Sequence, residues 1–253
     1  MIDTHCHVHD RAFDADRDEV IARARHAGVA AMVTVGEDLV DSERAIEIAR
    51  RYQLAAAVGI HPHEAKNAPE DVALGLRPLL SAERVVAIGE TGLDYYYEHS
   101  PAQRQAEVLR AQLRLARETA FPVIFHQRDA FEDFIAILRE EWRAGMHGVV
   151  HCFTGTPDQA RAYVDEFGLF LGIGGVLTFP KAETLRDAAR SVGAGWIVLE
   201  TDCPYLAPVP LRGKRNEPSF VSHTAAKLAD VLSLPLDDLA AATDANAVRL
   251  FGL

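Results

Sequence analysis

The chain has 253 residues, of which 49% are hydrophobic and 25% are charged, the composition of a globular protein with a sizeable core. Its formal net charge of −11 argues against a protein that coats nucleic acid, because phosphate binding normally depends on Lys and Arg. No apolar run approaches the ~20 residues of a membrane span and no signal-peptide pattern opens the chain, so we expect a cytoplasmic protein without membrane contacts.

Short apolar runs alternate with stretches of helical length along the chain. The apolar runs, rich in Val, Ile, Leu and Ala as buried parallel strands are, span residues 1–5, 30–36, 54–61, 84–90, 121–126, 148–153, 169–175 and 196–202. The stretches of helical length span 16–27, 41–52, 101–120, 129–141, 157–167, 181–191 and 219–234. Ser100 is expected to cap the helix of 101–120, with Pro101 at its first position. This alternation predicts a TIM-type (β/α)8 barrel that forms one domain over residues 1–253.

The three cysteines are Cys6, Cys152 and Cys203. Their odd number and wide spacing argue against a disulfide framework. Each directly follows a residue that can bind a metal, and in a strand such a neighbour points to the opposite face. We expect the cysteines to be small, buried packing residues.

Side chains that can bind a metal follow the predicted strands at their carboxyl ends, where barrel enzymes build their active sites. They are His5, His7, His61, His63, Glu90, His126, His151 and Asp202. Each alone has an ordinary alternative, a packed histidine or a carboxylate that caps a helix. Their convergence favours a metal centre, and even four of these imidazoles with the two carboxylates would be too many ligands for one tetrahedral zinc ion. Such a set fits two divalent ions that share a carboxylate and keep positions open for water.

The motifs also resemble those of a known family. DTHCH, GIHPH, AIGETGLDYYY, PVIFHQRDA, HCFTG and ETDCPYLAPVPLRGKRNEP resemble, in order, the signatures of the TatD family of metal-dependent hydrolases, whose members are reported as deoxyribonucleases within the amidohydrolase superfamily. The resemblance implies a first ion at His5, His7 and Asp202, a bridging Glu90, and a second ion at His126 and His151. His9 lies outside the pattern and is expected to be a loop residue.

The resemblance implies hydrolysis of a phosphodiester by a water that the two ions activate, with Mg²⁺, Mn²⁺ or Zn²⁺ as the candidate ions. Asp202 is expected either to act as the general base or to serve as a ligand only. A deep, acidic barrel mouth favours a fraying single-stranded end over an intact duplex, and the family's members imply 3′–5′ polarity. We therefore expect a monomeric exonuclease on single-stranded or frayed DNA.

Five residues are candidate substrate contacts. Arg128 follows the candidate ligand His126 by two residues, and Arg212 and Lys214 lie in the most basic short stretch of the chain. Their alternatives are a salt bridge at a helix start and a solvated loop. His61 and His63 are expected to touch the phosphate or protonate the leaving group, or, for His63, to orient another residue.

The aromatic segment 95–97 and Phe153 have two interpretations, stacking on an unpaired base and packing under a loop.

Two other functions of the protein also stay open. The same ligands would serve hydrolysis of another ester, such as that of a D-aminoacyl-tRNA, because ligands do not select the substrate. The third possibility is a metal-binding partner protein without catalysis.

Overall fold

All eight apolar runs predicted as strands form strands in the computed structural model, which describes residues 1–253. The strand order in the sheet is β1-β2-β3-β4-β5-β6-β7-β8, which is the order in the chain and the order predicted for a (β/α)8 barrel. The chain divides into two units, Met1–Thr34 with Cys152–Leu253 and Val35–His151. That the whole chain is one domain stays a prediction.

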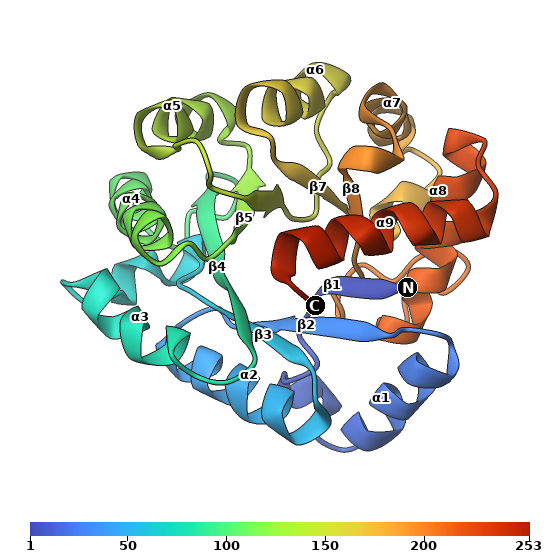
Figure 1. Ribbon diagram of the computed structural model, residues 1–253, viewed down its shortest axis with the longest axis horizontal. Coiled ribbons are helices and arrows are strands. Elements are labelled where there is room, and N and C mark those ends of the chain that lie inside the picture. Colours follow the sequence, from blue (N-terminus) through green and yellow to red (C-terminus); the bar gives the residue numbers. More distant parts are fainter. The chain divides into compact units, whose positions relative to one another are not determined.

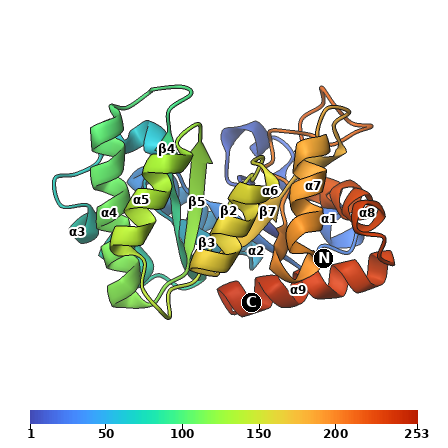
Figure 2. The same ribbon diagram turned by 90° about the horizontal axis from the view of Figure 1, so that it is seen from above.

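The first unit holds the N-terminal and C-terminal elements. It contains β1 (Ile2–Cys6), α1 (Arg17–His26), β2 (Ala31–Val35, at the boundary), α6 (Pro157–Arg161), β7 (Phe170–Ile173), α7 (Glu183–Val192), β8 (Ile197–Leu199), α8 (Val221–Leu232) and α9 (Leu236–Phe251). β1 pairs with β2 and β7 pairs with β8, both in parallel. α9 packs against β1 and β8, and Figure 2 shows both chain termini beside this helix.

The second unit holds the middle of the chain. It contains α2 (Leu39–Tyr52), β3 (Ala55–Val58), α3 (Val72–Leu80), β4 (Val85–Asp94), α4 (Ala102–Thr119), β5 (Val123–Arg128), α5 (Phe131–Glu141) and β6 (Gly148–Val150). β3, β4, β5 and β6 pair in parallel in that order. Figure 1 shows α4 and α5 lying outside β4 and β5.

β4 is longer than the sequence predicts, because it continues from residue 90 to Asp94. Side chains alternate along a strand, so Glu90, Gly92 and Asp94 lie on one face. Gly92 has a φ of 155°, and a Cβ built on it would lie 1.7 Å from the carbonyl oxygen of His126. Only glycine therefore lets β4 run this close to β5, and this contact positions His126.

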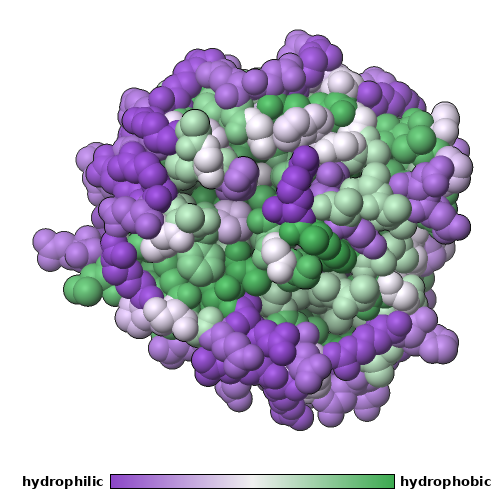
Figure 3. All heavy atoms as spheres, in the orientation of Figure 1, coloured by the Kyte–Doolittle hydropathy of each residue, from purple (hydrophilic) through white to green (hydrophobic).

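The helices bury their apolar faces and expose charged ones, and Figure 3 shows hydrophilic residues over the outer sides of α1, α2 and α4. Two helices, α3 and α9, were not predicted. The cap predicted at Ser100 is wrong, because Pro101 is the N-cap of α4 and the Ser100 hydroxyl donates to the carbonyl of His63. No helix combines the length and the apolar character that crossing a membrane requires.

Candidate metal centre

The first unit brings three predicted ligands together, His5, His7 and Asp202, which we call the first-unit cluster. His5 lies in β1, His7 follows that strand, and Asp202 follows β8. The Nε2 atoms of His5 and His7 are 3.2 Å apart, and Oδ1 of Asp202 lies 3.4 Å from Nε2 of His7 and 4.0 Å from Nε2 of His5. Two ligand atoms of one tetrahedral zinc ion lie roughly 3.3 Å apart, so this spacing fits a shared ion.

Backbone hydrogen bonds fix the first-unit cluster. The N–H of Asp202 donates to the carbonyl of His5 over 2.9 Å, and the N–H of His7 donates to the carbonyl of Cys203 over 2.8 Å. These two bonds join the end of β1 to the segment after β8. The ligands therefore come from segments far apart in the sequence that the backbone holds in register.

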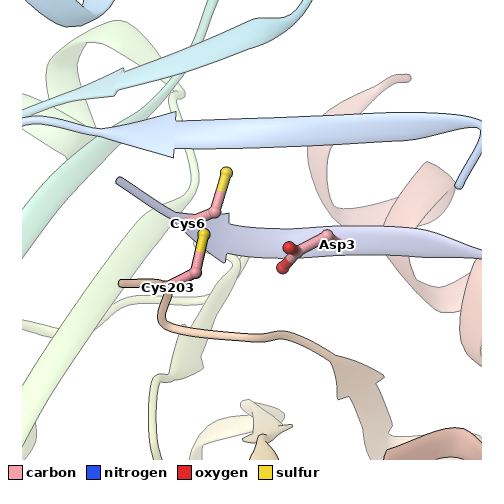
Figure 4. Close-up of side chains that lie close together, drawn as sticks. All are labelled: Asp3, Cys6 and Cys203. Carbon is pink, nitrogen blue, oxygen red and sulfur yellow. The ribbon is translucent and has the colours of Figure 1, made fainter. Parts of the chain in front are cut away.

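A second group of metal-competent atoms, Asp3, Cys6 and Cys203, lies within 4.8 Å in the same unit (Figure 4). The carboxylate of Asp3 accepts bonds from the N–H and hydroxyl of Thr201, at 2.9 and 2.6 Å, and the Cys6 thiol donates to the carbonyl of Val33. Burial raises the pKa of Asp3 to about 8 and the pKa of Cys6 well above its usual range. Burial therefore disfavours the charged forms of Asp3 and Cys6, and the full burial of Cys6 and Cys203 confirms these two cysteines as packing residues.

His9 and Cys152 lie close in the sequence to candidate ligands, and both form hydrogen bonds within the first unit. His9 lies in the turn after β1, as predicted for a loop residue, and is buried with Nδ1 2.7 Å from Oγ1 of Thr34. Cys152 is only partly buried, so the prediction of a buried packing residue does not hold for it. Its backbone N–H donates to the carboxylate of Glu200.

The second unit gathers its polar side chains around Glu90, and we call Glu90, His126, His151 and His61 the second-unit cluster. Oε1 of Glu90 lies 2.8 Å from Nδ1 of His126, 3.6 Å from Nε2 of His61 and 3.9 Å from Nε2 of His151. Glu90, His61 and His151 are buried, and His126 is largely so. Imidazole nitrogens and a carboxylate oxygen at these spacings fit zinc or manganese, and they leave the identity of the metal open.

His126 lies between two carboxylates. Its Nδ1 faces Glu90, and its Nε2 lies 3.0 Å from Oδ2 of Asp94. Burial alone would lower the pKa of His126, but the hydrogen bonds to Asp94 and Glu90 outweigh burial and raise this pKa to about 9. Without a metal both ring nitrogens therefore carry protons at neutral pH. Loss of the Nδ1 proton would expose a lone pair beside Glu90, while Asp94 keeps the ring oriented, as carboxylates do for many histidine ligands.

His61 is a hydrogen-bond donor in this cluster. Its Nδ1 accepts from the backbone N–H of His63, so the single proton of the neutral ring sits on Nε2. Burial lowers the pKa of His61 well below its usual value and keeps the ring neutral, although the charge of Glu90 opposes this shift. Nε2 of His63 lies 3.0 Å from Oδ2 of Asp94, so one of the two ring nitrogens of His63 is hydrogen-bonded to this carboxylate.

Asp94 is a candidate functional residue that the sequence analysis missed. It is fully buried, and its Oδ2 accepts from both His63 and His126. Burial alone would raise the pKa of Asp94, but the bonds from His126, the backbone of Tyr97 and His63 lower it below its usual range. Strand alternation from Glu90 through residue 92 was the signal that could have found it.

The predicted cationic contacts lie on exposed loops or strand ends. The guanidinium carbon of Arg128 lies 4.0 Å from the ring centroid of Tyr96, and no carboxylate pairs with it, so the salt bridge considered as its alternative does not form. Arg212 lies 3.8 Å over the ring of Phe179, and Lys214 is exposed. Phe153 is buried, which agrees with packing rather than stacking.

A family model described as TatD related DNase matches residues 2–252 of the chain. The chain belongs to this family. The TatD resemblance of the motifs is thereby confirmed, and the chain is a metal-dependent hydrolase of the TatD type.

Curated relatives and solved structures agree with this membership. "Uncharacterized metal-dependent hydrolase YabD" of Bacillus subtilis is 40% identical over 252 residues, which cover 99% of this chain and 98% of the relative. "3'-5' ssDNA/RNA exonuclease TatD" of Cronobacter turicensis is 42% identical over 258 residues, covering 99% and 97%. The crystal structure of YjjV, a TatD homologue of Escherichia coli, matches with a TM-score of 0.94 at 31% identity and covers 100% of this chain and 98% of that chain. This match confirms the predicted TIM-type (β/α)8 fold.

Proposed function

We propose that the protein is a divalent-metal-dependent deoxyribonuclease that removes nucleotides from the 3′ end of single-stranded or frayed DNA. The observation that carries the proposal is that each unit assembles its own ligands, His5, His7 and Asp202 in one and Glu90, His126 and His151 in the other. The relatives named as 3′–5′ exonucleases on single-stranded DNA and RNA, at 42% identity, support the substrate and the polarity. Monomeric state and cytoplasmic location stay predictions.

The first-unit cluster would hold one divalent ion, and Glu90, His126 and His151 of the second unit would hold another. Mg²⁺, Mn²⁺ and Zn²⁺ are the candidates, and the imidazole-rich donor set favours the latter two. When bound, the ions lower the pKa of water and stabilise negative charge on the phosphodiester. The protein's own part is to fix the ligands, to orient the substrate and to move protons.

Three kinds of side chain would perform that part. Asp202 is placed beside His7 at 3.4 Å and would accept the proton of the attacking water as general base, in addition to binding metal. Neutral His61 would donate a hydrogen bond from its Nε2–H to a phosphate or leaving-group oxygen, since its Nδ1 is already an acceptor. His63 has only Nδ1 left for the substrate, because Asp94 holds Nε2. Arg128, Arg212 and Lys214 would bind the backbone phosphates.

The experiment is degradation of end-labelled single-stranded DNA by the purified protein with Mg²⁺, with Mn²⁺ and with chelator. A 5′ label should give a ladder that shortens stepwise, whereas a 3′ label should appear at once as a single nucleotide. Glu90→Ala should abolish cleavage. Glu107→Ala, which removes an exposed carboxylate on α4, is the matched control and should cleave normally.

Metal-loaded protein that leaves both labels intact would overturn the nuclease proposal. The same ligands would then be assayed on another ester, with D-aminoacyl-tRNA as the first substrate. Immediate release of the 5′ label would instead overturn the proposed polarity.

A further inference from the structure

We infer that Tyr96, Tyr97 and Arg128 form a binding site for one unpaired nucleotide, in which Arg128 holds a phosphate and the ring of Tyr96 stacks on the base. We call these three residues the Arg128 platform. The inference rests on the proposed function, and it adds the group that would distinguish an unpaired end from a duplex. All three residues lie in the second unit.

The platform consists of a guanidinium in contact with two aromatic rings. The guanidinium carbon of Arg128 is 4.0 Å from the centroid of Tyr96 and 4.7 Å from the centroid of Tyr97. The two rings meet edge to face, with centroids 4.8 Å apart. Tyr96 is 57% exposed and Tyr97 is 49% exposed. Neighbouring tyrosines with this much exposed ring are typical of binding surfaces rather than of packing.

The charge of Arg128 is not neutralised by a carboxylate. Its side chain contacts the two rings, whereas Arg104, Arg110 and Arg114 of the same unit each bond to a glutamate. The N–H groups of a guanidinium lie along its edge, so a guanidinium that contacts an aromatic ring keeps donors that a phosphate can accept from. In a chain with a net charge of −11, this gives a local cation that a phosphate can reach.

One carboxylate connects the platform with the second-unit cluster. Oδ1 of Asp94 accepts the backbone N–H groups of Tyr96 and Tyr97, at 3.0 and 2.9 Å. The other oxygen of Asp94 accepts from the candidate ligand His126. The ring of Tyr97 also lies edge to face with His63, with centroids 5.4 Å apart. The platform is thus held at a fixed position beside a candidate metal ligand.

This arrangement favours an unpaired base over a paired one. A base inside a duplex has both faces covered by its neighbours, whereas a frayed terminal base offers a free face to an aromatic ring. One such stacking contact contributes about 5- to 150-fold in affinity, whatever the base, because every base has a π-face. The platform should therefore select single strands without selecting sequence.

The test compares two single-stranded oligonucleotides that differ only at the 3′ end, one natural and one ending in abasic tetrahydrofuran nucleotides. With wild-type, metal-loaded protein we expect KM for the abasic oligonucleotide to be about tenfold higher. In Tyr96→Ala the natural and the abasic oligonucleotide should have the same KM, because the stacking contact that distinguishes them is lost. Tyr96→Phe, which keeps the ring, should still distinguish the two oligonucleotides. Arg128→Ala should raise KM for both, because both carry phosphates.

The matched control is Tyr52→Ala, because Tyr52 also lies under an arginine, with the guanidinium carbon of Arg51 5.1 Å from its centroid. This variant should keep the wild-type KM on both oligonucleotides.

If Tyr96→Ala still distinguishes the two oligonucleotides as wild type does, the platform is overturned and the nuclease proposal stands. If wild type cleaves neither, the nuclease proposal fails. Fluorescence anisotropy of the same oligonucleotides then decides the platform, since equal wild-type affinity for both would overturn it and tighter binding of the natural end, lost in Tyr96→Ala, would support it.

Discussion

Asp94 accepts hydrogen bonds from His63 and His126 on a single oxygen, with both Nε2 atoms 3.0 Å from Oδ2. The bond to His126 leaves its Nδ1 facing Glu90 at 2.8 Å. A carboxylate behind a histidine fixes the ring's tautomer and orientation and raises its basicity as a ligand. The buried end of β4 therefore supplies both a candidate ligand, Glu90, and the residue that orients a second ligand.

Asp94→Asn should weaken metal binding at His126 by about 10- to 100-fold, because an amide does not stabilise the ligand as a carboxylate does. Asparagine preserves the size of the side chain and the oxygen that Tyr96 and Tyr97 bind. The affinity is measured by competition with a chromophoric chelator, together with the metal content of the purified protein. Asp133→Asn removes a carboxylate that accepts from the hydroxyl of Tyr95, and it should leave the affinity unchanged. Equal affinities in both variants would contradict the orienting role.

The raised pKa of His126 predicts a pH dependence of stability in the metal-free protein. Its folded pKa of about 9 lies above the unfolded value of 6.5, so the protonated ring stabilises the fold. The contribution is fully present below pH 6.5 and is lost as the pH rises to about 9. Across this window the free energy of unfolding should fall by about 3 kcal/mol.

The measurement is urea unfolding of the metal-free protein at several pH values, for wild type and for His126→Gln. The difference between the two curves isolates His126, because the titration of other groups such as Asp3 is common to both proteins. We expect wild type to lose stability relative to the variant between pH 6.5 and 9. Parallel curves would mean that the ring is not protonated in the fold.

Gly92→Ala should destabilise the protein on the order of 3 kcal/mol, because the new Cβ would lie 1.7 Å from the carbonyl oxygen of His126 and the φ is 155°. Thermal unfolding checks this result. Gly195→Ala is the control, because no atom lies within 4 Å of a Cβ built there, and its effect should stay within about 0.5 kcal/mol. A folded, stable Gly92→Ala protein would show that β4 can move away from β5, and its metal affinity should then drop as His126 shifts.

Periodicity and composition predicted the eight strands and most helices, because buried parallel strands form unbroken apolar runs. The end of β4 escaped this reasoning, since its glycines and polar residues interrupt the apolar run although the strand is buried. α3 escaped for a related reason, because Gly75 and Pro78 lie inside it. The motif residues predicted which candidate ligands come together within each unit. Asp94 was missed because its role depends on hydrogen bonds to two histidines from other segments.

The basic loop after β8 shows what charge counting alone leaves undecided. Arg215 forms an ion pair with Asp16, 199 positions away in the sequence, and its guanidinium also lies over the ring of Phe13. Arg212 and Lys214 of the same loop have no carboxylate partner. Adjacent cations therefore have different expected roles, one structural and two available to a phosphate.

Arg212→Ala and Lys214→Ala should each raise KM for single-stranded DNA and leave kcat and metal content unchanged, because phosphate contacts add affinity without touching the ligands. Each should also lower the slope of log affinity against log salt by about 0.7, the value for one lost contact to a single strand. Arg215→Ala should instead lower the melting temperature and keep the wild-type KM and salt slope. The salt dependence decides the matter, because a general loss of stability would not change it. An Arg215→Ala protein with the reduced slope, beside unchanged Arg212→Ala and Lys214→Ala proteins, would reverse this assignment.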